Sequence, residues 1–232
     1  MSKDFSYNHP FELAYWHYGL QLAQTWRERQ GLPRHKVWDD ILQHLAPLPE
    51  QNGIYTAGLP LIPFKQTTQT ADFDPFKTPE QQGGISLSEA DFLQKSRTDH
   101  PAVLGVAGLL PPALYDKEKM QQNLNWMLQN WNWPTTWGWD YGMTAMAAAR
   151  LGETQTAIDI LLSDQQKNRY LISGHNFQTA DRLRLYLPGN GALLTAIAMM
   201  CAGWDGCPET NNPGFPKDGT WNVRWEGLSR MQ

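Results

Sequence analysis

Two kinds of apolar segment alternate along the second half of this 232-residue chain, and this alternation constrains the fold most. Segments 102–110, 141–151 and 191–202 are apolar or small on every side, whereas 117–130 and 153–163 carry their apolar side chains on one face. A helix that is apolar all round is buried, and an amphipathic helix covers a core from outside. The pattern therefore predicts an all-α fold, an α/α toroid whose three inner segments are more buried than its two outer ones.

The first half of the chain predicts one helical hairpin and one long loop. Apolar residues three to four positions apart indicate helices over 11–30 and 35–46. No period survives over 47–87, which predicts a long irregular loop. A short capped helix is expected over 88–97.

These elements define the expected domains. The toroid helical domain is expected to span residues 1–203 and to contain about four hairpins. An irregular C-terminal tail follows at 204–232, and alternating apolar residues between Trp221 and Trp225 predict one short strand in it.

Composition and charge exclude several classes of function. The net charge is −4 and no run of Lys or Arg occurs, so no nucleic-acid partner is expected. No apolar stretch approaches the roughly 18 residues that span a membrane, and the first residues lack the apolar core of a signal peptide. The two cysteines, Cys201 and Cys207, cannot form a disulfide framework. The histidines lack zinc-site spacing, and neither a metal nor a cofactor is expected.

The polar and aromatic residues are concentrated where the predicted inner helices begin. Four entry segments, 8–12, 98–101, 131–140 and 173–190, are rich in Trp, His, Asp or Asn, whereas the turns at the opposite ends are short. Helix N-termini offer free N–H groups and a positive pole, which suit hydroxyl-rich or anionic ligands. We therefore expect the functional site at this end of the helices.

Asp140 is the candidate catalytic residue. It lies at the start of an inner helix, between Trp139 and Tyr141. Glycoside hydrolysis requires two carboxyl groups beside the scissile bond. We expect Asp140 to act as a general base or to bind hydroxyl groups, with its carboxylate facing a pocket. Helix capping is the alternative, and the two roles are compatible.

The candidate substrate-binding residues are polar or aromatic side chains of the same entry segments, which can bind hydroxyl groups or stack on sugar rings. They are His100, Asp99, Trp137, Trp139, His175, Asn176, Glu12 and Asn190. Structural alternatives exist for most of them. Asp99 and Asn190 are good helix caps, Glu12 complements a helix dipole, and Asx turns explain the His175–Asn176 loop.

Four motifs follow one another along the chain: HPAVLG at 100–105, TWGWD at 136–140, ARLG at 149–152 and PGNG at 188–191. In order and spacing they resemble the C-terminal portion of the six-hairpin (α/α)₆-barrel glycosidases, and most of all the bacterial enzymes of the family 95 and family 65 type. The resemblance runs from about Phe11 to Ala202.

The resemblance implies a glycoside hydrolase fold and a histidine at position 100 that contacts substrate. The relatives have six inner helices, so this chain is expected to be an incomplete toroid that lacks two upstream hairpins. The position of the general acid then falls before Met1, and Pro188 occupies the position of the family 95 catalytic base. The bare flanks of such a toroid are expected to be covered by self-association or by a missing N-terminal portion.

Three functions follow as hypotheses. The leading one is a glycosidase that cleaves an oligosaccharide or glycoconjugate by carboxylate acid–base catalysis. The second is a carbohydrate-binding or scaffold protein that keeps the fold without catalysis. The third is a lyase or epimerase on the same toroid, for which Arg182 and Arg184 would neutralise a substrate carboxylate.

Overall fold

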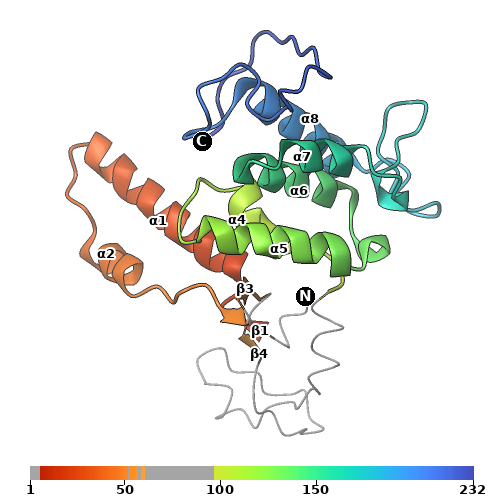
Figure 1. The fold of residues 1–232 in the computed structure, drawn as a ribbon. Coiled ribbons are helices and arrows are strands. Elements are labelled where there is room, and N and C mark those ends of the chain that lie inside the picture. Colours follow the sequence, from red (N-terminus) through yellow and green to blue (C-terminus); the bar gives the residue numbers. More distant parts are fainter. Residues whose placement is uncertain (1–5, 52, 57–58, 61–96) are drawn as a thin grey trace, which may run out of the picture.

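The computed structural model describes residues 6–51, 53–56, 59–60 and 97–232 and is mostly helical (Figure 1). Its α-helices are α1 (Pro10–Arg29), α2 (Lys36–Gln43), α4 (Gly105–Gly108), α5 (Lys117–Asn130), α6 (Gly138–Leu151), α7 (Thr154–Leu161) and α8 (Leu187–Ala202), and its 3₁₀ helices are η2 (Ala102–Leu104), η3 (Trp133–Thr135) and η4 (Gln166–Asn168). The prediction of a helical fold is confirmed. Of the described helices, none is long and apolar enough to cross a membrane.

Four strands of two residues each form two antiparallel pairs. Strand β1 (Ser6–Tyr7) pairs with β4 (Leu59–Pro60), and β2 (Glu50–Gln51) pairs with β3 (Ile54–Tyr55). Three of these strands lie in the segment 47–87 that was expected to be irregular, so its described part is more regular than predicted. Residues 61–96, with nearly all of the helix expected over 88–97, lie outside the described residues.

A buried amide holds β3 against α5. The side-chain Oδ1 of Asn123 accepts from the backbone N–H of Tyr55 at 2.8 Å, and its Nδ2 donates to the backbone oxygen of Tyr55 at 2.7 Å. Asn123 is fully buried. Both of its polar atoms are therefore satisfied without water, as a buried amide requires.

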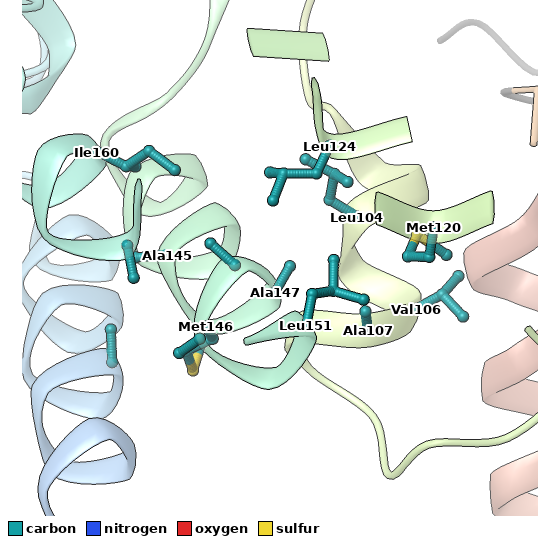
Figure 2. Packing of buried hydrophobic residues seen from close by; sticks show 14 of the residues in the cluster. Leu104, Val106, Ala107, Met120, Leu124, Ala145, Met146, Ala147, Leu151 and Ile160 are labelled. Atoms are coloured by element: carbon teal, nitrogen blue, oxygen red, sulfur yellow. The ribbon is translucent and has the colours of Figure 1, made fainter. Parts of the chain in front are cut away.

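Helix α6 is the centre of the molecule. Every residue of α6 except Trp139 is buried, and the helix packs against α4, α5, α7 and α8. Figure 2 shows Ala147 and Leu151 of α6 on the side of Ala107, and Ala145 on the side of Ile160. The small residues of this helix explain how so many neighbours can approach it.

Two glycines bring the backbones of α4, α6 and α8 into direct contact. A Cβ atom on Gly108 would lie 2.4 Å from the backbone oxygen of Met143, and one on Gly142 would lie 2.5 Å from the backbone of Ala192. Both distances are shorter than the closest approach of two non-bonded atoms. The order α4–α6–α8 across the core therefore depends on the absence of side chains at these two positions.

Helices α1 and α2 form the predicted hairpin, which extends away from the other helices (Figure 1). Gly31 ends α1 with a positive φ of 70°, as its place in the sequence predicted. The fully buried Gln24 joins the two helices, because its amide accepts from the N–H of His35 and donates to the oxygen of His35, both at 2.9 Å.

Burial follows the prediction for two of the three inner segments. Residues 102–110 and 141–151 are largely or wholly buried, and α5 and α7 bury one face each. The prediction is wrong for α8, where Leu194 is 67% and Ile197 is 39% exposed. Helix α8 packs one face against α6, and the described residues leave these side chains uncovered.

The apolar stripe predicted for α1 is also partly exposed. Tyr15, Leu22 and Trp26 belong to that stripe and are exposed, whereas Leu13 and Ala14 are buried. Helix α1 contacts η2 and α4 near its N-terminus. The residues that are buried are therefore set by this contact and not by the helical period alone.

The short strand expected between Trp221 and Trp225 is wrong. The structure describes all of residues 204–232, and residues 221–225 form no strand. Hydrogen bonds to one side chain hold them instead: Asn212 accepts from the indole N–H of Trp225 at 2.8 Å and donates to the backbone oxygen of Val223 at 3.3 Å.

The close approach of α6 and α8 gives a stability prediction. Replacing Gly142 with Ala forces the two backbones apart, and we expect the free energy of unfolding to fall by about 1–3 kcal/mol. Gly191→Ala is the matched control in α8, because a Cβ there meets no atom within 4 Å. Alanine there should stabilise the helix by up to about 1 kcal/mol. Urea denaturation measures both changes, and equal midpoints for the two variants would contradict the packing described here.

Candidate functional site

The entries of η2, α6 and α8 meet at one end of the core. The indole Nε1 of Trp137, just before α6, donates to Oδ1 of Asp99, just before η2, at 3.0 Å. The ring of Trp137 also lies 5.6 Å from the ring of Tyr186, the residue before α8. The expectation that the polar entry segments gather at one end is met for these three entries.

Asp140 lies in the first turn of α6 and is fully buried. Its Oδ2 accepts from the backbone N–H of Trp137 at 2.7 Å, and both of its oxygens lie 3.1 Å from Nδ1 of His100. The carboxylate thus caps α6 and binds His100, and it does not face open space as expected. The reason is that α6 is buried all round, so a side chain of its first turn is buried with it.

For both Asp140 and His100, burial shifts the pKa in one direction and the charge of the other residue shifts it in the opposite direction. Burial raises the pKa of Asp140, and the hydrogen bond and charge of His100 offset part of this. Burial lowers the pKa of His100, but the hydrogen bond and charge of Asp140, together with the charge of Asp99, outweigh it, so the net shift is upward from 6.5. The imidazole therefore holds its proton to a higher pH than an exposed histidine does.

Asp99 sits on the other side of the same imidazole. Its Oδ1 lies 3.4 Å from Nε2 of His100 and accepts from the indole of Trp137. Its φ of 65° lies in the left-handed region, which Asp adopts more readily than most residues. The carboxylate faces this cluster, and the N-cap of η2 is Pro101.

Two residues that precede α6 in the sequence hold the backbone of Asp99 in place. Its N–H donates to Oγ1 of Thr135 at 2.9 Å, and its carbonyl oxygen accepts from the indole N–H of Trp131 at 3.0 Å. Such constraints are what keep an uncommon backbone conformation in place. The position of the Asp99 carboxylate is therefore defined before any ligand binds.

Four ring side chains lie next to one another at this end, and we call them the ring row. Trp139 lies 4.7 Å from His100, His100 lies 6.1 Å from Trp137, and Trp137 lies 5.6 Å from Tyr186. All four residues are partly exposed. The predicted Trp137, Trp139 and His100 are thus brought together, as the site hypothesis requires.

Sequence reasoning missed Tyr186. It directly precedes the Leu187–Pro188 start of α8, and an aromatic residue in that place is also typical of core packing. Burial raises its pKa above 10.0, and the negative charge of Asp140 raises it further. The phenol is therefore neutral at physiological pH and available as a hydrogen-bond donor.

Asn176 is a buried support for the site. Its Nδ2 donates to the backbone oxygens of Lys167 and Arg169 at 3.0 and 3.1 Å. A Cβ atom on Gly138 would lie 1.9 Å from Oδ1 of Asn176, and one on Gly189 would lie 2.3 Å from it. The amide thus packs between the first turns of α6 and α8. Asn176 is fully buried, so we expect it to position the two helix starts and not to contact a ligand directly.

Asn190, His175 and Gln178 belong to the same frame. Asn190 accepts from the N–H of Asn176 at 2.8 Å and donates to the oxygen of Gly174 at 2.7 Å. His175 is half-buried, with Nδ1 3.1 Å from the hydroxyl of Ser173. Gln178 was not predicted: it accepts from the N–H of Gly138 at 2.9 Å and donates to the oxygen of Thr136 at 3.2 Å. The bonds of Asn190 fix the loop to the first turn of α8, and those of Gln178 fix it to the start of α6.

No described hydrogen bond or ion pair joins Glu12 to this cluster. It is exposed in the first turn of α1, where a carboxylate complements the helix dipole. Within the described ranges no group of three or more His, Cys, Asp or Glu residues could hold a metal ion.

The coupling of His100 to Asp140 is directly testable. In Asp140→Asn the side chain can still accept from the N–H of Trp137, but the negative charge that raises the pKa of His100 is lost while its burial remains. We expect this pKa to fall below its value in the unaltered protein, as measured by NMR titration of the imidazole. Asp99→Asn is the control and should lower the pKa less. An unchanged His100 pKa in Asp140→Asn would contradict the assigned pair.

The same coupling makes stability depend on pH. Because folding raises the pKa of His100, its protonation stabilises the fold fully below its unfolded value of 6.5, and this contribution is lost as pH rises through the raised folded value. The unfolding free energy of the unaltered protein should therefore decline above pH 6.5 more steeply than that of His100→Gln. Parallel declines in chemical denaturation would show that His100 is not responsible.

No family model, no curated protein and no solved structure matches this chain. The cluster of Asp99, His100 and Asp140, together with the ring row, is the candidate functional site.

Proposed function

We propose that this chain is the carbohydrate-processing core of an α/α-toroid glycoside hydrolase acting on an oligosaccharide or glycoconjugate. One observation carries the proposal: His100 lies between two carboxylates, Asp99 and Asp140, and beside the rings of Trp137 and Trp139. The succession α4–α6–α8, covered by α5 and α7, supports a toroid-like arrangement.

The chemistry of the cluster suits a sugar. The partly exposed indoles of Trp137 and Trp139 offer flat apolar surfaces for the faces of a sugar ring. A protonated imidazole donates hydrogen bonds to hydroxyl groups, and a carboxylate accepts them. Asp99 and His100 supply both types of group side by side.

The hydrolytic step assigns different roles to the two carboxylates. Asp140 is buried, so in this proposal it orients His100 through Nδ1 and stabilises the charged ring. The protonated Nε2 of His100 then donates its proton to the leaving glycosidic oxygen as the C–O bond breaks, while Asp99 accepts a proton from the water whose oxygen bonds to the anomeric carbon. Transfer of that proton from Asp99 to His100 restores the starting state. Asp99 is the carboxylate that contacts the substrate, since its side chain is 46% exposed.

Carbohydrate binding without catalysis is the second candidate. The burial of Asp140, with both oxygens engaged by His100 and Trp137, favours it, because a carboxylate so placed cannot touch a substrate directly. The lyase or epimerase alternative depended on Arg182 and Arg184. Both side chains are exposed and Arg182 pairs with Asp181, so no observation favours this third function.

Turnover of a panel of nitrophenyl glycosides by the full chain tests the proposal. If Asp140 orients a catalytic His100, Asp140→Asn should lower kcat by at least about 100-fold. Its Kd for the saccharide should change little. The pH profile should move to lower pH, because the pKa of His100 falls. A merely structural role would not move the profile.

The control for this experiment is Asp116→Asn. Asp116 caps α5 by accepting from the N–H of Lys119, and it is exposed and outside the cluster. It should leave turnover unchanged. Unchanged turnover in Asp140→Asn would reduce Asp140 to a helix cap, and saccharide binding without any turnover in the unaltered chain would favour the second candidate.

A further inference from the structure

We infer that Tyr186 forms a second binding position beside the cluster, so that the ligand is a saccharide of at least two sugar units. This inference rests on the proposed function and deepens it. The first position is the one at His100 and Trp139, and the second lies at the opposite end of the ring row.

The spacing of the ring row separates these two positions. Trp137 has His100 and Tyr186 as ring neighbours, at centroid distances of 6.1 and 5.6 Å, and the planes of these pairs are inclined by 38° and 47°. A sugar ring stacks on an aromatic face at contact distances of about 3.5–4 Å. Among the described residues no ring contact joins Tyr186 to Trp139, so we assign the ring of Tyr186 to a second unit of the same ligand.

The ring row is held in position before a ligand arrives. The indole of Trp137 is anchored by Asp99 at 3.0 Å. The N–H of Tyr186 donates to the oxygen of Asn176 at 2.9 Å, and the oxygen of Tyr186 accepts from the N–H of Gly189 at 3.0 Å. Binding a longer ligand to anchored rings costs little side-chain entropy. Because this entropy cost is low, an added sugar unit increases the affinity.

Tyr186 also suits the role chemically. Tyr186 comes from the segment that enters α8, whereas the other three rings come from the segments that enter η2 and α6. It therefore adds a third segment of the chain to the site. Its ring is partly exposed and its phenol is neutral, because burial and the charge of Asp140 raise its pKa. A neutral phenol can stack on a sugar and also donate to a hydroxyl group.

The experiment compares ligand lengths on the full chain. The probes are the methyl hexosides of glucose, galactose and mannose and the di- and trisaccharides of each hexose, with Kd measured by calorimetry. The variants are Tyr186→Ala, Tyr186→Leu, which keeps an apolar side chain, and Tyr186→Phe, which keeps the ring. Trp221→Ala is the control, since Trp221 is a partly exposed aromatic residue of the C-terminal segment. Circular dichroism verifies the fold of each variant.

We expect the unaltered chain to bind a trisaccharide more tightly than the methyl hexoside. Tyr186→Ala and Tyr186→Leu should weaken trisaccharide binding by about 3- to 10-fold and leave the methyl hexoside within about 2-fold. Tyr186→Phe keeps the stacking ring and loses only the hydroxyl donor, so it should weaken trisaccharide binding less than Tyr186→Ala does. Trp221→Ala should behave like the unaltered chain.

Two results would overturn the inference. If the methyl hexoside binds as tightly as the trisaccharide, or if loss of the Tyr186 ring weakens both equally, the ring row surrounds a single sugar while the proposed function stands. If no saccharide binds the unaltered chain, the proposed function fails and this inference fails with it.

Discussion

The burial of α6, in which only Trp139 is partly exposed, is the constraint on which the rest of the structure depends. A helix begins with N–H groups that have no partner within the helix, and a buried helix must find those partners in the protein. At α6 the amide of Gln178 accepts from the N–H of Gly138, and Asp140 accepts from the N–H of Trp137. Both acceptors tie neighbouring segments to the start of α6. The gathering of polar residues at this end is therefore a consequence of burying the helix.

Glycine positions determine how closely these entries approach. Gly142 lets α8 touch the backbone of α6, and the absence of side chains on Gly138 and Gly189 makes room for the amide of Asn176 between the two helix starts. Asn176 in turn binds the backbone of Tyr186. The same contacts that pack the core thus place a ring from α8 beside a ring from α6, and packing and site geometry share one origin.

Local pattern in the sequence was enough to predict the helices, but not their neighbours. The range 117–130 matches α5, because its apolar residues repeat at the helical period and Asp116 caps it. The exposure of Leu194 was not predictable, because α8 is apolar on all sides and its period does not show which side is covered. Likewise the entry segments were expected to meet, but the contact between His100 and Asp140 joins residues 40 positions apart. Whether a carboxylate there faces solvent or an imidazole depends on that packing.

The different surroundings of the two carboxylates determine what the cluster can do. Asp140 is fully buried and accepts from two partners, whereas the side chain of Asp99 is 46% exposed. A buried carboxylate that keeps its charge needs a cation or a donor beside it, and His100 meets this need by holding a proton. The charge of Asp99 adds to the same effect. Here the arrangement keeps the exchangeable proton on His100, on the side of the ring that faces Asp99, where a ligand held against the ring row would meet it.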